Sequence, residues 1–264
     1  MSSKIQWPSA KYWDKAWNPM MGCRPCSPAC DNCYARAWSD RFNLPFYPHL
    51  TSKGSPPRSG VVFCGNMTDL FGDWVDAEDR IDSIVRTLGR SDKATYLWLT
   101  KRPEALCDAL SRGTMIPSDD SSCDIPFRHV EFCNQFFGFT AENQEWYDRR
   151  FADWRCGKPT WANGWLSAEP LLGPIDLHLG YIAPEDLPFK WIVVGCESGP
   201  YRRPCRIDWV ESLVEQCMAR KVPVFVKQLD IGGRCVTDID RFPAHLRVRQ
   251  VPWVQPGLKV DSRM

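Results

Sequence analysis

The sequence predicts an α/β fold, a partial or full (β/α) barrel of parallel strands, and three observations carry this prediction. Short apolar runs recur along the chain, and polar or small residues follow each of them. Such continuous runs are typical of strands that are buried on both faces of a parallel sheet. Stretches with helical apolar spacing lie between several runs, as in repeated strand–helix units. Finally, a chain of 264 residues with 44% hydrophobic residues can bury the core of one such domain.

Six apolar runs are the expected strands of the sheet. Functional groups collect where strands end and loops begin in a barrel of this kind. We therefore expect the polar residues that follow the runs to meet at one site, which favours an enzyme. The runs are residues 61–64, 96–99, 136–139, 164–166, 191–194 and 222–226.

Two helices and two loop insertions complete the predicted elements. Residues 77–88 and 209–219 have one apolar face each, which predicts amphipathic helices. Residues 44–60 and 111–130 are rich in proline or in serine and aspartate, which predicts irregular loops. No domain boundary is evident, so we expect residues 1–264 to form a single domain. The apolar faces consist of Ile81, Ile84, Val85 and Leu88 in the first helix and of Trp209, Leu213 and Cys217 in the second.

Charge and composition exclude some classes of function. Lys and Arg number 33 against 32 Asp and Glu. The chain therefore has no large net positive charge that would attract nucleic acid. The N-terminus has no apolar signal core and no stretch is long enough to span a bilayer, which predicts a cytoplasmic protein without a membrane partner. Thirteen cysteines in such a protein indicate metal binding or redox chemistry rather than disulfides.

Four of these cysteines, at positions 23, 26, 30 and 33, lie within eleven residues. Pro25 and Pro28 prevent a regular helix between them, which leaves a loop that can fold its thiolates around one centre. Thiolates bind both zinc and iron–sulfur clusters. A structural zinc site needs four ligands, usually in two pairs with a longer spacer, whereas these four are crowded on one loop. The pattern therefore favours a [4Fe–4S] cluster, with a zinc-binding interaction protein as the alternative.

The cysteine loop and five later segments resemble a phage-rich family of the radical S-adenosylmethionine superfamily. The first match is WNPMMGC at residues 17–23, continued by SPACDNCYA at 27–35. The later matches follow in the same order as in the family, from residue 66 to residue 228. They are NMTDLF at 66–71, LTKRP at 99–103, SAEPLLGP at 167–174, VGCESGP at 194–200 and VKQ at 226–228.

Three positions depart from the family pattern. Ala29 stands where the family has glycine, Cys26 where it often has an aliphatic residue, and Cys196 where it usually has glycine. The family pattern implies that Cys23, Cys30 and Cys33 bind the cluster. The spacing found across the superfamily instead implies Cys26, Cys30 and Cys33, so the third ligand stays open.

The resemblance implies a radical SAM type of barrel and a reaction in which the cluster cleaves S-adenosylmethionine. An electron from an external donor of flavodoxin or ferredoxin type yields a 5′-deoxyadenosyl radical, which takes hydrogen from the substrate. The implied cofactor-binding residues are Tyr34, Asn66, Thr68, Asp69, Lys101 and Ser167, and the implied catalytic residues are Glu169, Glu197 and Lys227.

Some of these residues have structural interpretations as well. Asp69 suits a helix N-cap as well as it suits the ammonium group of S-adenosylmethionine. Lys101 is as well explained by a solvated strand end as by a bound phosphate. For Glu197 and Lys227, a buried ion pair is favoured over a role on the substrate side.

The expected substrate also comes from the resemblance. Some family members are linked to hypermodification of thymine in phage DNA, where one step moves a glycyl substituent from nitrogen to carbon. We therefore expect an isomerase that acts on a modified nucleobase in DNA, flipped into a pocket, in the host cytoplasm if the chain is phage-encoded. A radical enzyme acting on tRNA, a peptide or a small metabolite is the alternative.

Overall fold

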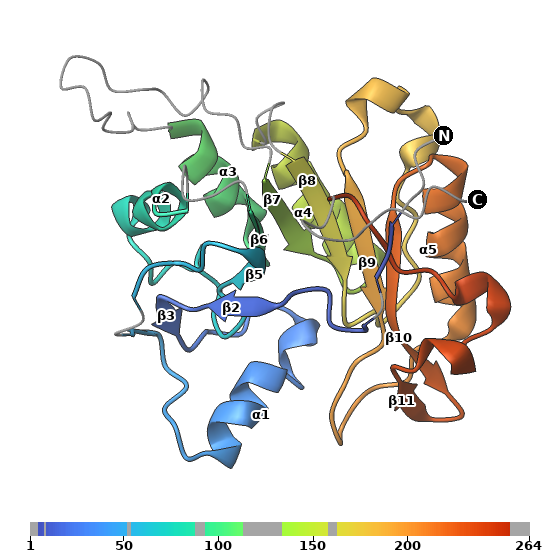
Figure 1. Ribbon diagram of the computed structural model, residues 1–264, viewed down its shortest axis with the longest axis horizontal. Coiled ribbons are helices and arrows are strands. Elements are labelled where there is room, and N and C mark those ends of the chain that lie inside the picture. The colour runs from blue at the N-terminus through green and yellow to red at the C-terminus, as the bar shows by residue number, and fades with distance from the viewer. Residues whose placement is uncertain are drawn as a thin grey trace.

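Seven parallel strands and one antiparallel strand form the central sheet of the computed structural model, in the order β11-β10-β9-β8-β7-β6-β5-β2. The structure describes residues 5–7, 9–51, 54–87, 93–112, 134–157 and 163–253. Figure 1 shows that the sheet curls without closing, so that β2 and β11 are its two edges. The predicted α/β fold is confirmed in the form of a partial barrel. The central strands are β2 (Lys15–Trp17), β5 (Gly60–Cys64), β6 (Ala94–Thr100), β7 (Gln135–Thr140), β8 (Asn163–Ala168), β9 (Trp191–Gly195), β10 (Val224–Ile231) and β11 (Arg234–Val236).

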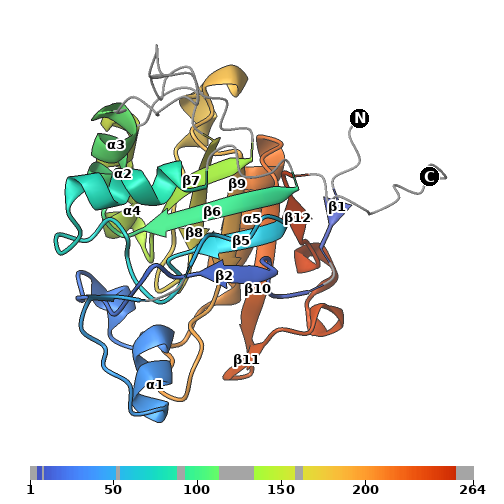
Figure 2. The same ribbon diagram turned by 60° about the vertical axis from the view of Figure 1, so that its left-hand side comes forward.

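The helices α2 to α5 cover the outer face of the curled sheet, whereas α1 stands apart beneath it (Figures 1 and 2). Two short antiparallel pairs, β1–β12 and β3–β4, lie outside the main sheet. The helices are α1 (Tyr34–Arg41), α2 (Ala77–Val85), α3 (Pro103–Arg112), α4 (Gln144–Gly157) and α5 (Ile207–Ala219), and the short strands are β1 (Ile5–Gln6), β3 (Met20–Met21), β4 (His49–Leu50) and β12 (Gln250–Val251). Single turns of 3₁₀ helix occur at Pro28–Cys30, Leu179–Tyr181, Pro184–Asp186, Ile239–Arg241 and Ala244–Leu246.

The six apolar runs are strands because both of their faces are buried. Alternate residues of β5 to β10 pack outward against the helices, and the residues between them pack inward. The inner layer is largely aromatic and is closed at one end by the segment around Trp7 and Tyr12 and by Trp253. Its strand residues include Phe63, Leu97, Phe136, Trp165, Trp191 and Phe225. The inner face therefore has a filled floor, above which the strand ends remain open.

Both predicted helices are present. Ile81 and Ile84 of α2 are buried, as are Leu213 and Cys217 of α5, whereas Leu88 lies outside the described residues. The described residues of the predicted insertion at 44–60 are irregular except for β4 and the first residue of β5. Residues 111 and 112 of the other predicted loop belong instead to the end of α3, and residues 52, 53 and 113–130 lie outside the described part. No helix among the described residues is long and apolar enough to cross a membrane.

Candidate functional site

One pocket at the carboxyl ends of the parallel strands contains every site residue that the sequence predicts. It encloses about 1140 Å³ of space, part of it open to solvent. Small-molecule sites of parallel sheets characteristically lie at this edge. The predicted residues in its wall are Cys23, Cys26, Cys30, Cys33, Tyr34, Asn66, Thr68, Asp69, Lys101, Ser167, Glu169, Glu197 and Lys227.

The alternation of the strands explains how distant residues reach this pocket. Ser167 and Glu169 follow Trp165 of the inner aromatic layer at intervals of two, so all three point to the inner face. Lys227 follows Phe225 in the same way on β10. The pairing of β10 with β9 shifts register between Val226 and Gln228, which places a bulge at Lys227. Bulges of this kind re-aim a side chain at the rim of a sheet.

The cysteine loop forms the wall opposite the strand ends. All four of its cysteines are free thiols and partly buried. The loop leaves β3 through Gly22, whose φ of +81° suits glycine and whose Cβ, if present, would lie 2.0 Å from the Tyr47 carbonyl oxygen. Arg203 donates a hydrogen bond of 2.9 Å to the Pro28 carbonyl, and the Ala29 amide donates one of 3.4 Å to Glu142. The loop is therefore held against the strand ends of the barrel.

The thiols differ strongly in acidity. The pKa of Cys30 is lowered to about 5, first because Cys26 donates a hydrogen bond to its thiolate and further because the Lys101 ammonium lies nearby. The same hydrogen bond raises the pKa of Cys26. Burial raises the pKa of Cys23 to about 11. Because the thiolate is the ligand form, the lowered pKa prepares Cys30 to bind a metal centre.

The donor set of the loop fits an iron–sulfur cluster. Among the described residues, no three His, Cys, Asp or Glu side chains are placed to share a single metal ion. The cysteines of a [4Fe–4S] cluster each bind a different iron atom, so their sulfur atoms need not converge on one point. Four thiols in one pocket wall, beside two cations, match what such an anionic cluster requires.

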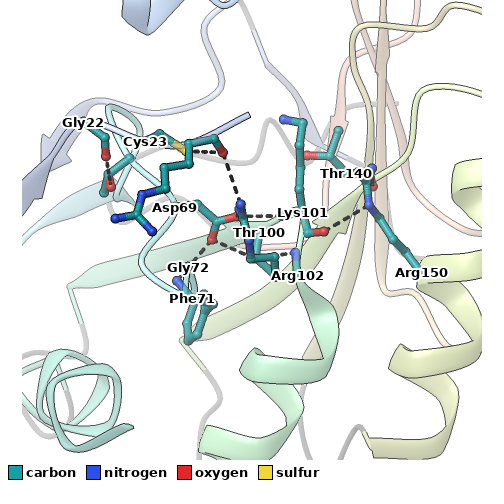
Figure 3. A network of polar contacts seen from close by, with 12 residues as sticks. Gly22, Cys23, Asp69, Phe71, Gly72, Thr100, Lys101, Arg102, Thr140 and Arg150 are labelled. Carbon is teal, nitrogen blue, oxygen red and sulfur yellow. Dashed lines mark hydrogen bonds and ion pairs between the residues drawn. The ribbon is translucent and has the colours of Figure 1, made fainter. Parts of the chain in front are cut away.

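Asp69 is the centre of a polar network that Figure 3 shows from close by. One carboxylate oxygen accepts hydrogen bonds from the Thr100 hydroxyl at 2.7 Å and the Phe71 amide at 3.1 Å. The other accepts from the Lys101 amide and the Arg102 guanidinium, both at 3.0 Å. The carboxylate thus ties the loop after β5 to the end of β6. Its interpretation as a helix N-cap is wrong, because α2 begins only at Ala77 and Asp69 stabilises a turn instead.

The loop after β5 is fixed to the cysteine loop by its other predicted residues. The Thr68 hydroxyl donates a hydrogen bond of 2.6 Å to the Gly22 carbonyl. Asn18 donates one of 2.8 Å to the Asn66 side chain, and the Tyr34 hydroxyl donates to the Asn66 carbonyl. These bonds hold the residues in the pocket wall, and their contacts with a cosubstrate stay a prediction.

Glu169 and Lys227 form an ion pair of 2.9 Å inside the pocket. Their side chains are 12% and 24% exposed, so both remain within reach of a ligand. The Lys227 ammonium also lies 5.9 Å from the ring centre of Tyr12 and 5.7 Å from that of Trp13. The predicted ion pair between Glu197 and Lys227 is therefore wrong, because the strand order places Glu169 beside the lysine instead of Glu197.

Glu197 is instead paired with Arg203. The Arg203 amide and guanidinium donate to one carboxylate oxygen at 2.8 and 3.0 Å, a second guanidinium N–H donates to the other, and Asn32 donates at 2.9 Å. Burial raises the pKa of Glu197, but the bonds from Arg203 and Asn32 outweigh it and lower the pKa overall. This network links the loop after β9 to the cysteine loop.

Several residues of the pocket were missed from the sequence. Tyr12 and Trp13 form its aromatic floor, yet they precede the first matched motif. Arg203 lies six residues after Glu197 and just beyond the matched motif that ends at residue 200. The Cys196 thiol lies in the wall and hydrogen bonds with Cys235, which lowers the pKa of Cys235 to about 7. Nothing in the spacing of these two cysteines indicated that they meet.

A family profile with the description "Protein of unknown function (DUF5131)" matches residues 2–241. This match spans the eight strands of the central sheet, the cysteine loop and every residue of the pocket. No curated protein and no solved structure matches the chain.

Proposed function

We propose that this chain, which belongs to the family described as a protein of unknown function (DUF5131), is a radical S-adenosylmethionine enzyme. The observation that carries the proposal is the meeting of four cysteines and the strand-end motifs in one pocket. When bound, a [4Fe–4S] cluster supplies the electron that cleaves S-adenosylmethionine to methionine and a 5′-deoxyadenosyl radical, which takes a hydrogen atom from the substrate.

The residues of the pocket have distinct tasks in this proposal. Cys30, Cys33 and either Cys23 or Cys26 hold the cluster, and the Lys101 ammonium offsets part of its negative charge. The Glu169 carboxylate accepts a hydrogen bond from a ribose hydroxyl, and Lys227 orients that carboxylate. The aromatic floor excludes water from the reacting carbon centres.

For the substrate we propose a modified pyrimidine base of DNA, isomerised by moving a substituent from nitrogen to carbon. Tyr34, Phe46 and Trp13 line the pocket and offer rings on which a flipped base can stack. The polar groups of Ser167 and Gln228 lie in the same wall and can bond to the edge of the base. An external electron donor of flavodoxin or ferredoxin type completes the reaction.

Metal analysis after anaerobic purification tests the cofactor. We expect about four irons and matching sulfide per chain, and release of 5′-deoxyadenosine when dithionite and S-adenosylmethionine are added. Cys30→Ala should lose the iron and abolish 5′-deoxyadenosine release. Cys156→Ala is the matched control, because Cys156 is an exposed cysteine of α4 outside the pocket. Colourless protein with about one zinc that leaves S-adenosylmethionine intact after reconstitution would support the zinc-binding alternative instead.

The substrate class needs a separate comparison. Reconstituted enzyme is offered a DNA duplex with a nitrogen-linked glycyl thymine, the same modified nucleoside alone, and transfer RNA. Formation of the carbon-linked isomer in the duplex, detected by chromatography and fragmentation mass spectrometry, supports the proposal. Conversion of only the RNA, or of only the free nucleoside, contradicts it.

A further inference from the structure

A second, basic pocket adjoins the first, and its residues outside the main pocket have no task in the chemistry proposed above. It lies between α2, the start of α3 and α4, and it shares Cys26, Lys101 and Arg102 with the main pocket. Five cations line it, against three carboxylates. One of these carboxylates, Asp73, is 72% exposed and lies 3.6 Å from Arg24 of the cysteine loop. The cations are Arg80, Lys101, Arg102, Arg149 and Arg150, and the carboxylates are Asp73, Glu104 and Asp153.

Arg150 is the best evidence for a ligand in this pocket. Its side chain is 2% exposed and forms an ion pair of 2.7 Å with Glu142. It also donates hydrogen bonds to the carbonyls of Lys101 and Thr140, as Figure 3 shows. Its remaining terminal nitrogen is buried and has no hydrogen-bond partner in the described part of the chain. A buried, charged donor without a partner is costly, and an anion in the pocket would relieve that cost.

A second unpartnered donor lies on the opposite wall. The Arg80 side chain of α2 donates a hydrogen bond of 2.8 Å to the Gly72 carbonyl. Its buried Nε, however, has no partner among the described residues. Unsatisfied guanidinium nitrogens therefore occur on two helices that line the same pocket.

The N-terminal end of α3 adds an electrostatic field that favours an anion in this pocket. Pro103, Glu104 and Ala105, the first residues of this ten-residue helix, line the pocket. The first N–H groups of a helix have no partners within the helix, and its dipole favours an anion at that end. Glu104 weakens this field, but the arginines outnumber it.

One aromatic ring, that of Trp146, holds two of the guanidinium groups in place. The Arg150 guanidinium lies 4.5 Å and that of Arg149 5.2 Å from the ring centre of Trp146. Planar guanidinium groups that are fixed in this way suit the oxygen atoms of a phosphate, to which they can donate paired hydrogen bonds. From these observations we infer that the basic pocket binds a phosphate group of the substrate, next to the base in the main pocket.

The assignment of this phosphate to the backbone of a nucleic acid strand rests on the proposed function, whereas phosphate binding itself does not. Binding can be measured without turnover, by titrating the full chain with single-stranded oligothymidylate, thymidine 5′-monophosphate, inorganic phosphate and thymidine. Thymidine is the control ligand because it contains the base and the sugar without phosphate.

Arg149→Ala is the test variant, because Arg149 is exposed and lines only the basic pocket. We expect the oligonucleotide to bind about tenfold more weakly. The slope of the logarithm of the binding constant against the logarithm of the salt concentration should fall by about the value of one phosphate contact. Arg80→Ala should give a similar loss from the other wall. Arg155→Ala is the matched control, since Arg155 is an exposed arginine of the same helix outside the pocket, and it should bind as the wild type does.

The pattern across ligands decides the outcome. Weaker binding of the oligonucleotide by the two test variants indicates that the site takes a backbone phosphodiester. Weaker binding of the monophosphate alone indicates a phosphorylated small molecule. Either result supports the phosphate site. Three results would overturn the phosphate site: an equal loss of affinity in Arg155→Ala, an equal loss of affinity for thymidine, or unchanged affinity in both test variants. Release of 5′-deoxyadenosine without substrate should be unchanged in Arg149→Ala, so failure of the radical chemistry and failure of the phosphate site are separate results.

Discussion

Two carboxylates of the main pocket, Asp69 and Glu169, look alike in the sequence but differ in their surroundings. Each follows a strand and each forms an ion pair, Asp69 with Arg102 at 3.0 Å and Glu169 with Lys227 at 2.9 Å. Asp69 accepts three further hydrogen bonds, whereas Glu169 has only its lysine among the described residues. The comparison teaches that the number of protein donors, more than the position at a strand end, separates a structural carboxylate from one available to a ligand.

Replacing Asp69 should give the largest effect on stability. Asp69→Ala leaves the Arg102 guanidinium without its carboxylate and breaks the link between two loops, so we expect the free energy of unfolding to fall by about 3 kcal/mol. Urea unfolding followed by circular dichroism measures this. Asp73→Ala is the matched control in the same loop, because its side chain is 72% exposed, and it should change the free energy by about 0.5 kcal/mol or less. Equal stability of the two variants would contradict the structural role of Asp69.

Replacing Glu169 should affect activity rather than folding. Glu169→Gln keeps the shape of the side chain but weakens the hydrogen bond to a ribose hydroxyl, so we expect kcat/KM for 5′-deoxyadenosine release to fall about 30-fold. The free energy of unfolding should change by about 1 kcal/mol, because Lys227 keeps a polar partner and is partly exposed. Unchanged kinetics together with a large loss of stability would place Glu169 in the same class as Asp69.

Glu197 sharpens the comparison as an intermediate case. The pKa of Glu197 is lowered in the folded protein, so its bonds to Arg203 stabilise the fold. This contribution is fully present when the pH is above the ordinary pKa of glutamic acid, about 4.3. It is lost as the pH falls through the lowered pKa of the folded state. We expect Arg203→Ala to lower the free energy of unfolding by about 2 kcal/mol at neutral pH, and by less at about pH 3. Urea unfolding at the two pH values measures the difference.

A matched arginine controls for general surface charge in this experiment. Within the part of the chain that the structure describes, Arg206 pairs only with Asp208, and both side chains are more than half exposed. Arg206→Ala should therefore leave the urea midpoint of unfolding unchanged at either pH. A loss for Arg203→Ala that does not depend on pH would exclude the Glu197 carboxylate as its cause.

Much of the fold followed from local pattern. The six apolar runs are parallel strands β5 to β10, and the helices at residues 77 and 207 begin within two residues of their predicted starts. The edge strands β2 and β11 were not predicted, because each has three residues and at most one fully buried side chain. Pairing of such short segments depends on neighbours that a local pattern does not contain.

The candidate site was predictable as a set of residues but not as a set of interactions. The motifs at the strand ends meet in one pocket because parallel strands all end at the same edge of a sheet. Which acid meets which cation depends on strand order and on the bulge at Lys227, and neither is visible in the local sequence. The pairing of Lys227 with Glu169, fifty-eight positions away, was therefore missed.

Local sequence pattern is enough to specify the strand–helix alternation, the loop that presents four cysteines and the edge of the sheet at which polar groups gather. Hydrophobic periodicity and proline placement act over a few residues, so they are encoded locally. Three other features depend on packing between distant segments: the four protein donors around Asp69, the floor formed by Tyr12 and Trp13, and the basic pocket lined by Arg80 and Arg150. These features arise where segments distant in the chain are packed together, because burial removes water as a partner and makes each remaining polar contact depend on the neighbouring segment.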